Sequence, residues 1–186
     1  MLPMHEQTLR LALLYGSDRP LRFCDTVANW TLQRVDALGG WKTDRLDPAT
    51  PAGRHGPSLV RKVRTADAFL VVTPEYNHGY PAALKSMIDA VYTQWQAKPV
   101  AFVSYGGHSG GLRAVEQLRQ VFASLHAVPL RDGVGFANAQ ARFAADGSLP
   151  REDPAYEAMR LALWRLGWWA SALRNARQAT PYDAAA

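Results

Sequence analysis

Ala68-Phe69-Leu70-Val71-Val72-Thr73-Pro74-Glu75-Tyr76-Asn77-His78-Gly79-Tyr80-Pro81 is the stretch of sequence that decides the fold. Its first six residues form an apolar run, which is typical of a parallel strand covered by helices on both faces. The run ends in a polar segment bounded by Pro74 and Pro81, whose rings restrict the backbone, and Gly79 within it permits a positive φ. The stretch therefore predicts a central strand of an α/β sheet with a rigid loop at its carboxyl end.

Strands and helices alternate on both sides of this stretch. The other strands are expected at 9–15, 41–46, 100–105 and 127–130, the last continuing toward 136. Helices are expected at 22–38, 58–65 (capped by Ser58), 81–92, 112–125 and along an apolar stripe over 159–173, with loops at 47–57 and 138–153. This alternation predicts an α/β fold, a doubly wound five-stranded parallel sheet with helices on both faces.

Length and composition favour a single domain. The chain has 186 residues and is 48% hydrophobic, which suits one domain over residues 1–186 with an ordered core at about 8–177. Its formal net charge is +5, but the lysines and arginines are scattered, so nucleic acid is not an expected partner. No apolar stretch approaches the ~18 residues of a membrane helix, and the N-terminal residues lack a signal-peptide core. We therefore expect a cytoplasmic protein with no membrane partner.

Cysteine and histidine usage narrows the chemistry further. Cys24 is the only cysteine, which excludes an internal disulfide and a cysteine-built metal site. The histidines show no ligand-like spacing, so no metal is expected. Cys24 falls in the first turn of a predicted helix, where a thiolate would be favoured.

Three loops should meet at the carboxyl edge of the sheet, where ligands of such folds bind. The first, 16–22, places Ser17, Arg19 and Arg22 before a helix N-terminus, a combination that suits a phosphate group. The alternative is a surface turn with two solvated arginines. The loop lacks the G-x-x-x-x-G-K-[ST] pattern of nucleotide triphosphatases and the G-x-G-x-x-G pattern of dinucleotide-binding folds.

The other two loops suit a flat aromatic ligand. In 74–80, Tyr76 can form a wall and Asn77 can contact the ligand edge, unless the loop is only a rigid crossover. In 106–111, glycines let backbone N–H groups approach a ligand, although a flexible connection would also contain them. His78 and His108 lie in these two loops and suit either contact with a substrate or an exposed rim position.

With these loops in place, the chain resembles the NAD(P)H-dependent FMN reductase family, which has a flavodoxin-like fold. The resemblance is carried by Gly16-Ser17-x-Arg19-Pro20-x-Arg22-Phe23, by Thr73 through Lys85, and by Ser104-x-Gly106-Gly107-x-Ser109-Gly110-Gly111-x-Arg113-Ala114. It implies FMN as cofactor, NADPH or NADH as co-substrate, and phosphate binding at Ser17, Arg19 and Arg22. The implied cofactor-binding set is Ser17, Arg19, Arg22, Phe23, Pro74, Glu75, Tyr76, Asn77, Gly106, Gly107, His108 and Ser109.

The resemblance also implies an activity and an assembly. Electrons would pass to a quinone, an azo compound, a metal oxyanion or free flavin, with no obligate catalytic side chain because the flavin carries the redox chemistry. A homodimer or homotetramer is implied, with the flavin near the subunit interface. A non-catalytic FMN electron carrier and a regulatory module that has lost FMN are the alternatives.

Two departures from the family pattern affect the helix start after the proposed phosphate loop (16–22) and the helix after the second loop (74–80). Phe23, Cys24 and Asp25 stand where many relatives have Ser and Asn, and Ser86 stands where many have Asn. Near the end of the chain, Trp164, Trp168 and Trp169 are expected to be core or interface residues.

Overall fold

The computed structural model describes residues 8–183. Its elements follow the order β1 (Leu9–Tyr15), α1 (Cys24–Leu38), β2 (Trp41–Leu46), α2 (Pro51–Arg54), α3 (Pro57–Thr65), β3 (Ala68–Pro74), α4 (Ala82–Asp89), a 3-10 turn η1 (Thr93–Trp95), β4 (Pro99–Tyr105), α5 (Leu112–Ser124), β5 (Val128–Phe136), α6 (Ala139–Arg142) and α7 (Ala155–Ala179). The five strands form one sheet in the order β2-β1-β3-β4-β5, and every pair is parallel. The predicted doubly wound sheet is confirmed.

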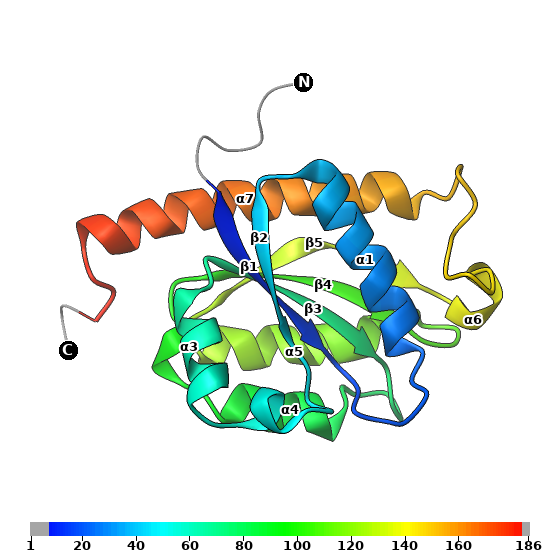
Figure 1. The fold of residues 1–186 in the computed structure, drawn as a ribbon, viewed down its shortest axis with the longest axis horizontal. Coiled ribbons are helices and arrows are strands. Elements are labelled where there is room, and N and C mark those ends of the chain that lie inside the picture. Colours follow the sequence, from blue (N-terminus) through cyan, green and yellow to red (C-terminus); the bar gives the residue numbers. More distant parts are fainter. Residues whose placement is uncertain (1–7, 184–186) are drawn as a thin grey trace.

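The sheet is covered on both faces, with α1 and α7 on one side and α3, α4 and α5 on the other (Figure 1). β3 shows why its sequence is apolar throughout. Phe69 and Val71 pack into the core under α3, α4 and α5, whereas Leu70 and Val72 pack into the core under α1 and α7. A strand with alternate side chains in two separate cores has no solvent-facing position to fill with a polar residue.

Short elements appear where the sequence predicted loops. Pro51 opens α2, where its missing N–H costs nothing, and the Thr50 hydroxyl accepts a hydrogen bond of 3.1 Å from the amide of Gly53. α6 likewise interrupts the predicted loop at 138–153. Ser58 lies inside α3, which starts at Pro57, so its predicted capping role is wrong.

The helix predicted at 81–92 is also shorter than expected. α4 ends at Asp89, and a 3-10 turn follows at Thr93–Trp95. Trp95 is fully buried, and its indole N–H donates to the carbonyl oxygens of Val91 and Ile88 at 2.9 and 3.2 Å. We attribute the break to this anchored side chain, which periodicity alone did not reveal.

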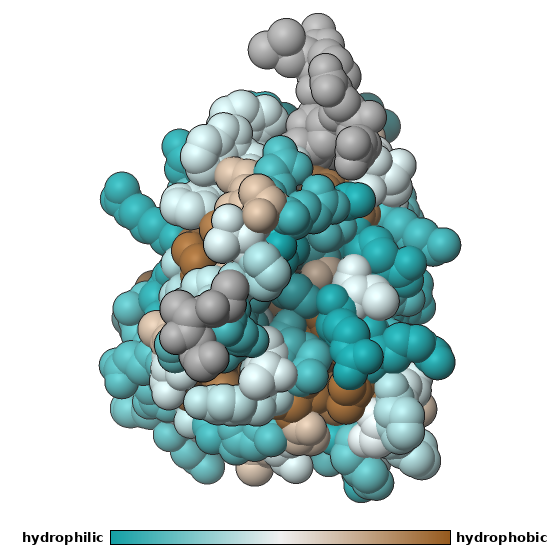
Figure 2. Space-filling model, turned by 90° about the vertical axis from the view of Figure 1, so that its left-hand side faces the viewer, coloured by the Kyte–Doolittle hydropathy of each residue, from teal (hydrophilic) through white to brown (hydrophobic). Residues whose placement is uncertain are grey.

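The outer surface is mostly polar on the side seen in Figure 2, where apolar residues show only in small areas. The tryptophans of α7 are a separate exception, since Trp164, Trp168 and Trp169 are 47%, 55% and 38% exposed. They are therefore not core residues. No helix within residues 8–183 combines the length and hydrophobicity required to cross a bilayer.

The strand order locates the functional edge. From β1 the chain crosses first to β2 on one side and then returns to β3 on the other. The carboxyl ends of β1 and β3 consequently flank the switch point at which ligands of doubly wound sheets bind.

Candidate functional site

The loop after β1 begins with a glycine that β3 requires. The Gly16 amide donates to the carbonyl of Val72 at 2.7 Å. A Cβ at this position would lie 2.7 Å from both the Cα of Thr73 and that carbonyl oxygen. These are backbone atoms of β3, which cannot move away to make room for a side chain. Gly16 thus lets the ends of β1 and β3 run in close contact, so that their loops emerge together.

These two loops meet through Ser17 and Tyr76. Their hydroxyl oxygens lie 2.8 Å apart, and Ser17 is completely buried. The guanidinium carbon of Arg19 lies 3.8 Å from the centre of the Tyr76 ring, a cation–π arrangement. Arg19 itself is exposed and has no acidic partner among residues 8–183. Its positive charge is therefore available to an anion that binds at this loop.

Arg22 has a different environment from Arg19. Its guanidinium forms a bidentate pair with Asp47, with N–O distances of 2.7 and 2.6 Å, and also contacts Asp25 and the carbonyl oxygen of Ser17. The hydrogen bonds to Asp47 raise the pKa of Arg22 against the effect of its burial. Arg22 thereby connects the loop after β1 to Asp47, directly after β2. Its expected contact with phosphate stays a prediction.

Asp47 was not among the residues singled out from the sequence. Burial raises the pKa of this carboxyl, but the hydrogen bonds from Arg22 and the Ala49 amide outweigh that effect and lower it. The signal was present in the sequence, since Asp47 is the first residue after β2 and so belongs to the same carboxyl edge.

The loop after β3 closes in a tight turn. The amides of Tyr76 and Gly79 donate to each other's carbonyl oxygens at 2.9 and 3.0 Å. Asn77 and His78 hold the positive φ angles of 49° and 69°, as a type I′ turn requires. The positive φ angles of this turn thus fall on Asn77 and His78 and not on Gly79; Asn and His tolerate that region better than most residues. Both side chains are exposed at the tip.

Glu75 joins this loop to the next one. Its side chain is 5% exposed, and its carboxylate accepts hydrogen bonds from the Ser109 hydroxyl at 2.8 Å and from Arg113 Nε at 2.6 Å. Burial raises the pKa of Glu75, but the hydrogen bonds from Arg113 and Ser109 more than offset it, and the pKa lies below its ordinary value. The Glu75 carboxylate is therefore engaged with the protein, and we assign it a positioning role.

The loop after β4 is held by its backbone. The amide of Gly106 donates to the carbonyl of Phe136 at 3.2 Å, and the carbonyl of Gly107 accepts from the amide of Asn138 at 2.9 Å. Gly111 takes a φ of 86°, and a Cβ there would lie 2.7 Å from the Cβ of Ser104. By contrast, a Cβ on Gly107 would meet no atom within 4 Å, so the backbone here borders open space.

A cluster of aromatic side chains, Phe23, Tyr105 and Phe143, packs next to these loops. The ring of Phe23 packs edge-on against Tyr105 and Phe143, with centroids 5.9 and 5.6 Å away. Cys24 is fully buried beside Tyr105, and burial raises the pKa of its thiol. The expectation that helix α1 favours a thiolate at Cys24 is therefore wrong, because desolvation outweighs the helix N-terminus.

The assembled loops fit a phosphorylated aromatic ligand. The Ser17 hydroxyl and the Arg19 guanidinium lie together at one end of the site. The open backbone at Gly107 offers room for a flat ring. The buried Pro74 is the last residue of β3, which lies between the strands that lead to Ser17 and to Gly107. His108 is exposed on the rim and makes no hydrogen bond or ion pair within the described part of the chain. These features suit FMN as the sequence resemblance implies.

Comparison with known sequences agrees with this geometry. The sequence profile of the NADPH-dependent FMN reductase family matches residues 9–141. An NAD(P)H-dependent FMN reductase of Schizosaccharomyces pombe is 36% identical over 133 residues, which are 61% of this chain and 66% of that protein. A probable NADPH:quinone oxidoreductase of Oryza sativa subsp. japonica is 39% identical over 134 residues, 67% of this chain and 68% of that protein.

A second yeast relative covers less. The NAD(P)H-dependent FMN reductase LOT6 of Saccharomyces cerevisiae is 51% identical over 68 residues, or 37% of this chain and 35% of that protein. The chain thus spans between about a third and two thirds of the length of these relatives.

Solved structures share the fold. The flavoenzyme FerB of Paracoccus denitrificans superposes with a TM-score of 0.68 at 24% identity, covering 88% of this chain and 98% of that one. A flavodoxin of Pseudomonas aeruginosa superposes with a TM-score of 0.58 at 21% identity, covering 89% and 99%. At these identities the likeness establishes a flavodoxin-like fold.

Proposed function

The chain belongs to the NADPH-dependent FMN reductase family, and we propose that it is an FMN-dependent oxidoreductase that takes hydride from NAD(P)H and passes electrons to a small-molecule acceptor. The observation that carries this proposal is the contact between Ser17 and Tyr76 at the switch point. It brings the loop that we propose to bind the phosphate next to the aromatic ring of Tyr76, an arrangement that suits a phosphorylated flavin.

The residues of this chain would bind and orient the cofactor. Ser17 and Arg19 hold the phosphate, Tyr76 and the backbone at Gly107 contact the ring system, and Asn77 contacts its edge. When bound, FMN supplies the hydride-accepting chemistry. Hydride transfer requires no side-chain acid or base, so the protein's contribution is geometry and local electrostatics. Glu75 supports that geometry because its carboxylate links the second and third loops.

The acceptor is proposed from the relatives and from the open rim. The names of plant relatives from rice and potato specify quinone reduction, which favours a quinone ahead of an azo compound, a metal oxyanion or free flavin. His78 and His108 lie exposed at the rim and would meet the nicotinamide or the acceptor as it enters. Either NADPH or NADH is compatible with this rim, and a cytoplasmic location remains a prediction.

Assembly into a homodimer or homotetramer is part of the proposal. Its support is the exposed tryptophan face of α7, where Trp164, Trp168 and Trp169 present apolar rings outward. Large exposed aromatic side chains are typical of surfaces that pair with another chain.

The function is tested with the purified protein. FMN is titrated by flavin fluorescence, and NADPH and NADH oxidation is then followed with a benzoquinone, an azo dye, ferricyanide and free FMN as acceptors. We expect FMN binding and rapid oxidation of at least one nicotinamide. Binding without oxidation would indicate an electron carrier, and failure to bind FMN would indicate a module that has lost the cofactor.

Arg19→Met provides the matched site variant. It should weaken FMN binding by about tenfold or more, because it removes a charge-assisted contact to the phosphate. Arg61→Gln, which removes an exposed arginine from α3, serves as the control and should leave FMN affinity unchanged.

A further inference from the structure

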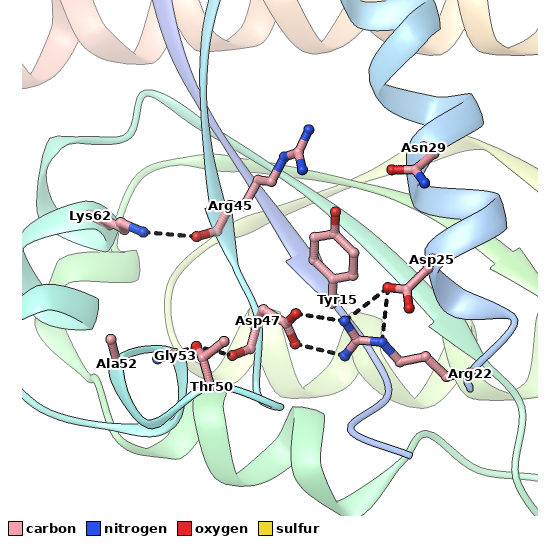
Figure 3. Close-up of a pocket in the computed structure, with 10 residues that line it drawn as sticks. All are labelled: Tyr15, Arg22, Asp25, Asn29, Arg45, Asp47, Thr50, Ala52, Gly53 and Lys62. Carbon is pink, nitrogen blue, oxygen red and sulfur yellow. Dashed lines mark hydrogen bonds and ion pairs between the residues drawn. The ribbon is translucent and has the colours of Figure 1, made fainter. Parts of the chain in front are cut away.

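A cavity of about 410 Å³ lies beside the phosphate loop, on the side of β2 (Figure 3). Its walls come from the end of β1, from α1, from the end of β2 and from the segment containing α2 and α3. Of the proposed flavin-binding residues only Arg22 lines this cavity, where its guanidinium pairs with Asp47. The volume falls in the range of small-molecule sites, and nothing in the proposed flavin chemistry uses it.

Tyr15 presents its hydroxyl to this cavity. The residue is only 5% exposed, and the guanidinium of Arg22 lies 5.0 Å from the centre of its ring. Its hydroxyl points away from the Arg22–Asp47 pair, into the space between Arg45 and Asn29 (Figure 3). Within residues 8–183 this hydroxyl has no hydrogen-bond partner. A hydroxyl that lines a cavity and has no partner among these residues is free to bond a ligand, and burial of the residue raises the pKa of Tyr15, so the hydroxyl keeps its proton and can donate it.

The charges around the cavity favour an anion. The charge of Arg22 is neutralised by Asp47 and Asp25. Arg45 and Lys62 also line the cavity, and neither has an acidic partner in the described part of the chain. Lys62 instead donates to the backbone carbonyl of Arg45 at 3.0 Å. Three cations, Arg22, Arg45 and Lys62, thus line the cavity against two carboxylates, Asp25 and Asp47, and the lining carries a net charge of one positive unit.

We propose that this cavity is a second ligand site, apart from the flavin loops, that binds a small molecule carrying a phosphate group. The planar guanidinium of Arg45 matches a phosphate better than a point charge would. Tyr15 and Asn29 supply hydrogen bonds to it, and the remaining volume accommodates a group of about nucleoside size. Arg22 forms the wall shared with the phosphate loop, since it lines the cavity while it donates to the carbonyl of Ser17.

The test compares two sites on one protein. Adenosine 5′-monophosphate, adenosine, inorganic phosphate and succinate are titrated calorimetrically into the protein saturated with FMN. We expect the monophosphate to bind, inorganic phosphate to bind more weakly, and adenosine to give no signal. Arg45→Gln should weaken monophosphate binding about tenfold or more, and Tyr15→Phe about three- to tenfold. Arg61→Gln, an exposed arginine outside the cavity, should change nothing.

The decisive result is a double dissociation. Arg45→Gln should weaken the monophosphate and leave FMN affinity unchanged, whereas Arg19→Met should do the reverse. The proposal is overturned if neither phosphate probe binds at millimolar concentration, if Arg45→Gln leaves binding intact, or if succinate binds as tightly as phosphate. Displacement of the monophosphate by FMN would also overturn it. If the protein takes up no FMN, the same titrations on the flavin-free protein still test the cavity, so the two proposals fail separately.

Discussion

The hydroxyl oxygens of Ser17 and Tyr76 lie 2.8 Å apart, although 59 positions separate them in the chain. The contact joins the loop after β1 to the loop after β3, and Arg19 covers the same tyrosine ring. The groups proposed to bind the phosphate and the ring are thus organised as one unit, which would reduce the cost of ordering them when the cofactor binds.

Tyr76→Phe tests this unit with the smallest available change. The variant keeps the ring and the stacked Arg19 but removes the hydroxyl that contacts Ser17. We expect the FMN dissociation constant to rise about three- to tenfold, the value of one hydrogen bond, and thermal stability to fall modestly because the buried Ser17 hydroxyl loses that partner. Fluorescence quenching by the protein measures the affinity, and an unchanged constant would show that the contact does not organise the site.

Arg22 and Asp47 should act as a structural pair. The side chains are only 8% and 23% exposed, so removing one partner leaves a charge that is poorly solvated. Arg22→Met and Asp47→Asn should each lower the free energy of unfolding by about 2–4 kcal/mol. Urea denaturation of both variants and of the double variant measures the coupling. Simple additivity of the two losses would contradict the assigned pairing.

Two glycines should respond in opposite ways to alanine. Gly16→Ala places a Cβ against the backbone of β3 and should destabilise the protein severely. Gly107→Ala meets no protein atom, so the fold should tolerate it, while the added methyl group enters the space assigned to the flavin ring. We expect normal melting and weakened FMN binding for Gly107→Ala. Full FMN affinity in this variant would place the ring elsewhere.

Glu75 should make stability depend on acid pH. Its folded pKa lies below the ordinary value of 4.5 because hydrogen bonds from Arg113 and Ser109 outweigh burial. The unfolded chain therefore binds the proton more readily, and the contribution is present above pH 4.5 and lost as the pH falls through the folded pKa. Glu75→Gln should lower stability at neutral pH by about 1–2 kcal/mol. Its stability should also vary less with pH below 4.5 than that of the parent, and parallel pH profiles would rule out this account.

Trp168 tests the proposed assembly. It is the most exposed of the three tryptophans on α7, at 55%. Trp168→Glu should shift the protein toward the monomer in sedimentation velocity, because a charge replaces an apolar contact. Leu112→Glu, at an exposed apolar position on α5, is the control. An unchanged oligomer in Trp168→Glu would move the interface to another surface.

The sheet could be predicted because its signal is local. β3 and β4 are apolar at almost every position. An uninterrupted apolar strand is needed only where helices bury both faces of the sheet. The prediction also gathered the three loops correctly at one edge, since parallel strands bring their carboxyl ends together. Local spacing accounts in the same way for the ion pair of Lys85 with Asp89, 2.6 Å apart, because residues four positions apart lie on one face of a helix.

The finer features depend on contacts between distant segments. Whether Arg22 faces a ligand or the protein is decided by Asp47, 25 positions away. Glu75 is engaged by Ser109 and Arg113 of the next loop, and no pattern around Glu75 reveals this. The protonation of Cys24 is likewise decided by the burial that Tyr105 and β3 impose, which local helix position does not reveal.

The most direct test of the central claim is an FMN titration of the flavin-free protein, followed by anaerobic addition of NADPH or NADH while the flavin absorbance is recorded. The account predicts equimolar FMN binding that Arg19→Met weakens, and rapid bleaching of the bound flavin by a nicotinamide. Absence of FMN binding, or a bound flavin that neither nicotinamide bleaches, would contradict it.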